Sequence, residues 1–270
     1  MNPIPTRLAR AVLLGATVLA ATACTDREAQ RQAQAAAEAL AREQAATKLQ
    51  GEYDAAVTAA NWELARVHGA ALLAQYPETE AATVVEPALA DITARAEAAR
   101  EQRRLGALWN YARVAAGKGE QRSAAIFSRE PVDTDGAAPA TVQLVIRDHP
   151  EWKRSAYLVL QGGDFDCYGG CKVKVAFDEA APKPMSAWRP KTDEAIAMFI
   201  EDYRGLWKRM RQAQRVSIEF PVRAGGTRTA VFEVGGLDGS QMPGWDGEVR
   251  RPMARQRVPA AAVDRARSAP

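Results

Sequence analysis

Histidine and cysteine are scarce in this chain of 270 residues, which contains two of the first and three of the second. A Ser-His-Asp site needs a histidine beside its nucleophile, and the G-x-S-x-G turn that could present such a serine is absent. The sequence also has no P-loop and no G-x-G-x-x-G motif. His68 and His149 lie in different segments, so we interpret both as packed or solvated. We therefore expect no catalytic site and no cofactor.

The chain also has no strong net charge of either sign, because its 36 basic residues are nearly balanced by 33 acidic ones. This balance gives no indication of a nucleic-acid-binding or anionic-membrane surface. Long apolar runs are equally rare. Residues 11–23 form one uncharged apolar run, which is shorter than the ~20 residues that a membrane-spanning helix needs. No second run is long enough to cross a membrane.

The N-terminal segment has the three regions of a secretory signal. Arg7 and Arg10 precede the apolar run, and the exit "LAATAC" places small residues directly before Cys24. This exit resembles the lipobox of bacterial lipoproteins, in which the cysteine receives a diacylglycerol and the signal is cut before it. The resemblance implies that residues 1–23 are removed and that Cys24 is lipidated.

Ordinary signal cleavage after "ATA" is the alternative, because Ala21 stands where a lipobox usually has leucine. It would give a soluble periplasmic protein. We favour the lipid because a polar segment rich in Ala, Gln, Glu and Arg follows Cys24 directly, as a tether would. In enterobacterial lipoproteins an aspartate after the cysteine retains the protein at the inner membrane. Thr25 stands there in this chain, so the resemblance implies a periplasm-facing lipid anchor in the outer membrane.

The two remaining cysteines, Cys167 and Cys171, form an even pair in an oxidising compartment, which indicates a disulfide. They are separated by "YGG" and flanked by "SAYLVL" and "CKVKVAFD", whose alternation is typical of strands. Directly opposed residues of an antiparallel pair come within disulfide range. We therefore predict that the disulfide closes a hairpin between two adjacent strands.

Metal or redox chemistry at this cysteine pair is a weaker interpretation. A zinc site needs four ligands, and the two histidines lie in other segments. A redox dithiol normally uses C-x-x-C at the start of a helix, whereas the spacing is one residue longer in this chain. Three nearby acids lack the spacing of an EF-hand loop: Asp164, Asp166 and Asp178. We expect neither a metal nor turnover.

The first half of the chain is expected to be helical. Residues 24–50 favour helix but include only two large apolar residues, which predicts a lipidated helical or flexible tether. Within residues 51–104, "NWELARVHGAALLAQYP" resembles the second helix of a tetratricopeptide repeat, with Ala65 and Pro77 at the packing and terminating positions. A solenoid needs three or more repeats, so we expect one helical hairpin that serves docking. Two plain amphipathic helices are the alternative.

From residue 105 the pattern changes to short alternating segments separated by turns. A helix is predicted at 193–213, with Thr192 as its N-cap and apolar residues at three-and-four spacing. Consecutive strands with one late helix indicate an α+β fold, in which residues 105–238 form an antiparallel sheet with one packed helix. Residues 239–270 are rich in Pro, Ala and Arg and are expected to be a largely disordered tail.

The order of elements in residues 105–238 resembles that of small periplasmic proteins associated with type VI secretion. The corresponding features are an opening tryptophan segment, "LVIRD", "AWRPKTDEA" and "FEVGGL". This resemblance concerns the fold, and no site residue follows from it. Four tryptophans could line a pocket, although packing in the core is the default expectation: Trp109, Trp152, Trp188 and Trp207.

Two classes of function remain. The first is a lipid-anchored interaction module that docks an envelope protein or a secretion or assembly machinery. The second is a ligand-binding or weakly enzymatic lipoprotein that acts on envelope polymers. A flat apolar patch would favour the first, and a concave pocket with converging polar groups would favour the second. We expect the first, with an envelope protein as partner, membrane contact through the lipid alone, and no nucleic acid or metal.

Overall fold

The structure is a computed structural model that describes residues 9–191 and 196–245, with side chains from residue 27 onward. The chain divides into two compact units, residues 1–100 and 101–270, which we call the helical unit and the sheet unit. Helices make up the first unit, and an antiparallel sheet with a packed helix makes up the second. The predicted α+β class is therefore confirmed.

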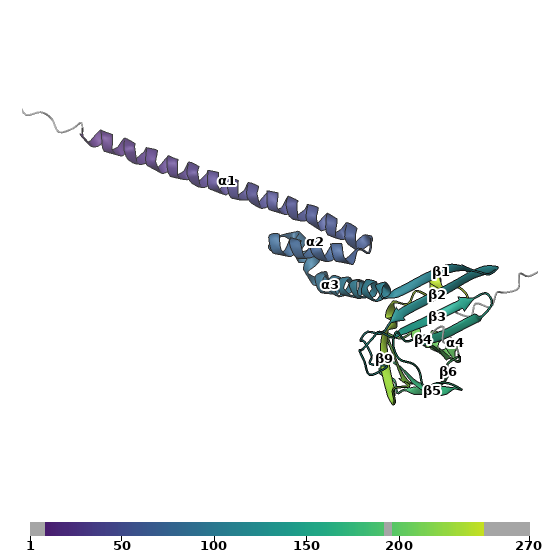
Figure 1. The fold of residues 1–270 in the computed structure, drawn as a ribbon. Helices are drawn as coiled ribbons and strands as arrows, with labels where there is room; N and C mark the ends of the chain where they lie inside the picture. The colour runs from purple at the N-terminus through teal and green to yellow at the C-terminus, as the bar shows by residue number, and fades with distance from the viewer. Residues whose placement is uncertain (1–8, 192–195, 246–270) are drawn as a thin grey trace, which may run out of the picture. The chain divides into compact units, whose positions relative to one another are not determined.

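Three helices form the helical unit, α1 (Ala9–Thr58), α2 (Trp62–Gln75) and the first part of α3 (Glu80–Ala107) (Figure 1). Side chains 27–42 of α1 are exposed, as expected for a helix with few large apolar residues. Packing begins at Ala46, within the segment expected to be a tether, and α1 continues without a break into the helical pair. Alanines make up half of the buried core residues: Ala46, Tyr53, Ala56, Ala65, Leu72, Ala81, Val85 and Ile92.

The segment that resembles a tetratricopeptide helix forms α2. Asn61 caps its N-terminus by accepting a hydrogen bond from a backbone N–H in the first turn, and the helix ends two residues before Pro77. Gly69 is buried, and a Cβ there would lie 2.8 Å from Leu89 and 3.3 Å from Tyr53. The missing side chain thus lets α1 and α3 both approach α2 closely.

Nine antiparallel strands form one sheet in the described part of the sheet unit, in the order β1-β2-β3-β4-β7-β6-β5-β8-β9. Strands β4 and β5 follow each other in sequence but are separated in the sheet by β7 and β6. The bounds are β1 (Trp109–Ala116), β2 (Gly119–Phe127), β3 (Gln143–His149), β4 (Lys153–Val159), β5 (Cys171–Phe177), β6 (Lys183–Trp188), β7 (Ala197–Ile200), β8 (Arg215–Pro221) and β9 (Thr227–Glu233).

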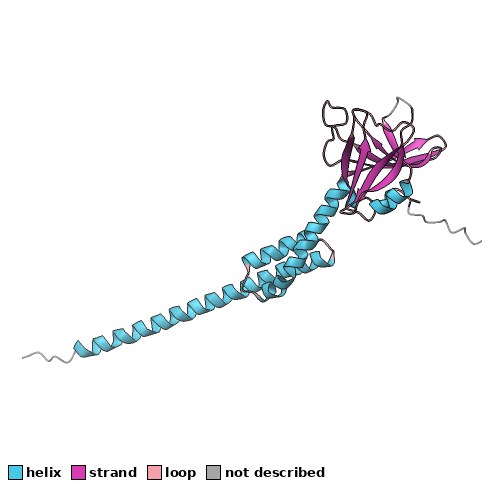
Figure 2. Ribbon diagram, turned by 90° about the horizontal axis from the view of Figure 1, so that it is seen from below, coloured by secondary structure: helices cyan, strands magenta, loops and turns pink. Residues whose placement is uncertain are grey.

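The sheet curves around one hydrophobic core, to which eight of its strands contribute alternate residues (Figure 2). Val173 and Val175 of β5 illustrate the pattern, because both are buried while Lys172 and Lys174 are exposed. Burial of such side chains stabilises by roughly 1.5–3 kcal/mol each before entropic costs are counted. One face of every central strand is therefore committed to the core, and the other face remains outside.

The predicted helix at 193–213 is wrong over its first part. Residues Ala197–Ile200 form β7, and the helix α4 covers only Tyr203–Met210, capped by Asp202, whose carboxylate accepts from the Gly205 N–H at 2.9 Å. The quartet "AMFI" fits a strand as well as a helix, and pairing with β4 and β6 decides between them. The predicted N-cap Thr192 lies outside the described residues.

The first residues of the predicted tail are part of the fold. Two 3₁₀ turns, η1 (Val234–Gly236) and η2 (Gly239–Gln241), follow β9. Met242 and Trp245 are buried in the core, and the ring centroid of Trp245 lies 5.1 Å from that of Trp207 on α4. Residues 239–245 of the tail that was expected to be largely disordered are therefore ordered, and residues 246–270 lie outside the described residues.

Candidate functional site

Three aromatic side chains lie side by side on the outer face of the sheet. Tyr157 of β4, Phe199 of β7 and Trp188 of β6 occupy directly opposed positions in the strand register. The Phe199 ring centroid lies 4.9 Å from that of Tyr157 and 4.9 Å from that of Trp188. Their sequence neighbours are buried, so the alternation of the strands directs all three rings outward.

Arg147 of β3 and Trp152 of the β3–β4 turn extend this row. The guanidinium carbon of Arg147 lies 5.1 Å from the Tyr157 ring centroid and 5.2 Å from the Trp152 ring centroid. Trp152 is 65% exposed and Trp188 is 43% exposed, which is unusual for such large apolar side chains. We call Arg147, Trp152, Tyr157, Trp188 and Phe199 the aromatic strip.

The β3–β4 turn is built to hold Trp152. His149 is buried, and its Nδ1 accepts hydrogen bonds from the backbone N–H groups of Glu151 and Trp152, both at 3.1 Å. Its ring stacks on the Trp152 ring with centroids 4.1 Å apart. Lys153 closes the turn with a φ of +62°, a conformation that residues other than glycine rarely adopt. His149 is therefore a structural residue, as expected, and its structural task is to position an exposed indole.

The electrostatics of the strip centre on Arg147. Its Nε is buried and has no hydrogen-bond partner among the described residues. Burial raises the pKa of the Tyr157 hydroxyl, and the charge of Arg147 and a hydrogen bond to it oppose this shift in part. The phenol is therefore neutral at physiological pH and can donate a hydrogen bond. The strip thus combines two exposed indoles, a neutral phenol and a cation held between aromatic rings.

The Cys167–Cys171 disulfide is present, with Cα atoms 5.1 Å apart. The predicted hairpin is wrong, however, because β5 pairs with β6 and β8 instead of β4. The disulfide closes a tight turn that leads into β5, in which Gly170 N–H donates to the Cys167 carbonyl at 3.2 Å. Both Gly169 and Gly170 have positive φ values, which explains why this turn contains two glycines.

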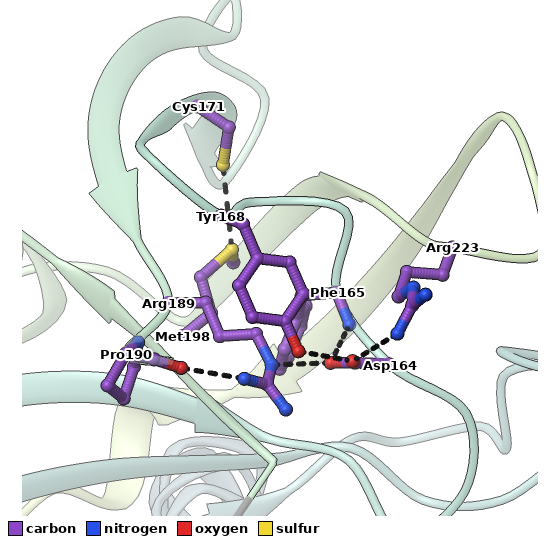
Figure 3. A network of polar contacts seen from close by, with 8 residues as sticks. All are labelled: Asp164, Phe165, Tyr168, Cys171, Arg189, Pro190, Met198 and Arg223. Carbon is purple, nitrogen blue, oxygen red and sulfur yellow. Dashed lines mark hydrogen bonds and ion pairs between the residues drawn. The ribbon is translucent and has the colours of Figure 1, made fainter. Parts of the chain in front are cut away.

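A buried ion pair fixes the disulfide turn to the end of β6 (Figure 3). Arg189, whose side chain is 3% exposed, donates from Nε to Asp164 Oδ1 at 2.5 Å. The other carboxylate oxygen of Asp164 accepts from the Tyr168 hydroxyl at 3.0 Å and from Arg223 at 3.5 Å. Tyr168 also covers the Arg189 guanidinium with its ring, 4.5 Å from the centroid. All these groups have partners within the fold, so we interpret the network as a structural clasp.

A groove of about 240 Å³ lies between the end of α4 and the β5–β6 turn. Arg209 lies over the Phe177 ring at 5.6 Å, while the Asp178 carboxylate accepts from the backbone N–H groups of Gln214 and Arg215, both at 2.8 Å. The volume of the groove is below the ~300–1,000 Å³ of typical small-molecule sites. Polar and charged residues are among those that line the groove, and two of them, Arg209 and Asp178, are engaged by the contacts just described.

The other residues singled out from the sequence do not assemble into a site. His68 lies on α2 with its Nδ1 3.5 Å from Glu52 of α1. Within the described residues, no three or more His, Cys, Asp or Glu side chains are placed to hold a metal ion. None of the helices in that same part of the chain has the length and apolar character needed to cross a bilayer. Cys24 lies on α1, but its side chain is outside the described range.

No protein-family model, curated protein or solved structure matches this chain. The site must therefore be judged from its own geometry. The default interpretation of the tryptophans holds for Trp109 and Trp207, which are buried, but it is wrong for Trp152 and Trp188. Trp152 follows "HPE" in a turn, which was the available signal that it could be exposed.

Proposed function

We propose that this chain is a lipid-anchored cell-envelope module that docks an envelope protein through the aromatic strip. The observation that carries the proposal is the exposure of Trp152 and Trp188 at the two ends of a row in which the Arg147 guanidinium joins the Trp152 ring to the rings of Tyr157, Phe199 and Trp188. Trp, Tyr and Arg are the side chains that dominate binding energy at protein interfaces. The strip contains all three on rigid strands, which limits the entropy lost on binding.

The proposed anchor is a lipid on Cys24 in the outer membrane, with the exposed part of α1 as a spacer. A helix rises 1.5 Å per residue, so the 16 exposed residues 27–42 alone would extend about 24 Å. Three acyl chains would hold the chain stably at the membrane, because two already suffice. This arrangement would leave the sheet unit free to meet partners in the periplasm.

Site-specific photo-crosslinking in intact envelopes tests the docking function. p-Benzoylphenylalanine is introduced at Trp152, at Trp188 or at Val114 of β1, which is 55% exposed and lies outside the strip. We expect the two strip positions to give an adduct of the same mass, identified by mass spectrometry as one envelope protein, and the Val114 position not to give it. Equal adducts from all three positions, or none from the strip, would contradict the proposal.

A further inference from the structure

The aromatic strip contains a cation without a matching anion. Arg147 makes no ion pair with any carboxylate among the described residues, and Asp148, its neighbour in sequence, pairs instead with Arg154 at 2.9 Å. Several arginines of the sheet unit do have acidic partners, including Arg122 with Glu120, whereas Arg209 resembles Arg147 in lying over an aromatic ring. Arg147 is therefore held by two aromatic rings in place of a carboxylate.

The environment of Arg147 favours a ligand carboxylate. Its guanidinium is partly buried, and its Nε is shut off from solvent without a partner. A partly desolvated cation attracts an anion more strongly than a cation in bulk water does. A guanidinium also presents a planar fork that binds a carboxylate through two parallel hydrogen bonds. The rings of Trp152 and Tyr157 on either side would exclude water from such a pair.

The outer face next to the strip is mixed: Ser123 of β2 and Ser155 of β4 lie directly opposite Arg147, whereas the positions beside Tyr157 are apolar. Val145 and Ala125 border the strip on β3 and β2, and both are apolar. The hydroxyl of Ser155, opposite Arg147 in the register, is buried. A sugar carries hydroxyl groups along its whole ring, and each one needs a partner when it is buried. The part of the strip from Tyr157 to Trp188 therefore suits apolar side chains of a peptide better than it suits a glycan.

We propose that the aromatic strip binds an acidic peptide segment of its partner, with one carboxylate on Arg147 and apolar side chains on the rings toward Trp188. This inference rests on the proposed docking function. The strip crosses β3, β4, β7 and β6, and three strand spacings of ~4.8 Å give about 14 Å. Same-side residues of an extended peptide are ~6.6 Å apart, so an acid at position i would place residues i+2 and i+4 over the rings.

The test uses the full chain, purified in detergent, and two synthetic peptides. These are acetyl-Glu-Ser-Leu-Ser-Leu-amide and the same peptide with Gln in place of Glu. Binding is followed by NMR through the six tryptophan indole N–H signals, two of which are assigned with Trp152→Phe and Trp188→Phe. We expect the acidic peptide to shift both signals and to bind at least tenfold more tightly than the Gln peptide.

Substitutions separate the role of Arg147 from a general effect of charge. Arg147→Gln should abolish the preference for the acidic peptide, and Arg147→Lys should retain part of it. Arg122→Gln on neighbouring β2 is the matched control, because it also removes one positive charge from the sheet. This variant should leave the preference for the acidic peptide unchanged. The remaining four indole signals report whether each variant keeps its fold.

Each outcome decides a different point. Equal binding of the two peptides would overturn the carboxylate position on Arg147 and leave the docking function in place. Binding of a hyaluronan tetrasaccharide at the strip, without binding of either peptide, would overturn the peptide class in favour of an acidic glycan. Absence of crosslinks from Trp152 and Trp188 would overturn the docking function itself, whatever the peptides do.

Discussion

Loss of the Cys167–Cys171 disulfide should weaken the sheet unit moderately and leave its fold intact. The two cysteines are four positions apart, so the bond closes a loop of only five residues. The chain-entropy model gives about 2 kcal/mol for a loop of this length. Native contacts of the turn remain after reduction, including the Arg189–Asp164 ion pair and the backbone bond between Gly170 and Cys167.

The expected change in melting temperature follows from the size of the domain. A loss of 1 kcal/mol lowers the midpoint by about 2–4 °C in a domain of this size, so reduction should lower it by about 4–8 °C. Replacement of both cysteines by alanine should lower the midpoint slightly further. Cys167 is 1% exposed, and its removal also takes sulfur contacts out of the core.

Tryptophan fluorescence is a suitable probe, because five of the six tryptophans belong to the sheet unit. Thermal unfolding is compared for the oxidised chain, the reduced chain and the double alanine variant, with thiol alkylation and mass spectrometry to establish the redox state. An unchanged midpoint after reduction would refute the entropic argument. Global unfolding after reduction would contradict the prediction that the sheet unit keeps its fold without the disulfide. Two free thiols in protein exported through the native envelope would refute the disulfide itself.

Three further expectations concern other parts of the chain. Cys24→Ala should abolish incorporation of labelled palmitate and release the chain into the soluble periplasmic fraction, and equal labelling of the variant would contradict the anchor. Gly236→Ala should cost at least ~2 kcal/mol in denaturant titrations, because its Cβ would overlap the backbone at the end of α3, whereas Gly51→Ala in open space on α1 should stabilise by about 1 kcal/mol. Hydrogen bonds from Ser240 and from the Gln241 side chain lower the pKa of Asp238. The ionised Asp238 therefore adds to the free energy of unfolding above about pH 4, and this stabilisation is lost as the pH falls through the lowered pKa. Asp238→Asn should therefore destabilise at pH 7 by an amount that shrinks in acid, and a pH-independent difference in stability would contradict this reasoning.

The sequence predicted the local features of the sheet unit but not the order of its strands. The alternation around Val173 and Val175 indicated correctly which face of β5 is buried. Alternation does not specify the neighbouring strand, and the hairpin assigned to the cysteines failed for that reason. In the sheet, β7 and β6 lie between β4 and β5, although β5 follows β4 in the sequence. Pairing between strands that are distant in sequence leaves no pattern in a short stretch of residues.

The aromatic strip could not be predicted for the same physical reason. Tyr157, Phe199 and Trp188 are far apart in sequence, and they become neighbours only because β7 inserts between β4 and β6. The segment that forms β7 was expected to be helical, which would have placed Phe199 in an apolar helix stripe. Assigning a helical period instead of a strand period to these four residues was therefore enough to conceal that Phe199 is the central ring of the strip.

The β3–β4 turn gives the best physical reason to regard the strip as functional. A non-glycine residue in the left-handed region costs of order 1–3 kcal/mol, and Lys153 adopts this conformation at the position after Trp152. The indole that this turn presents is 65% exposed, so its burial does not offset the strain. His149 nevertheless contributes two hydrogen bonds and a stacked ring to keep that indole in place. A left-handed residue is common in short hairpin loops, and Ala60 and Asp178 also adopt this conformation. The exposure of a stacked indole, more than the strain at Lys153, is therefore what supports a docking role for the strip.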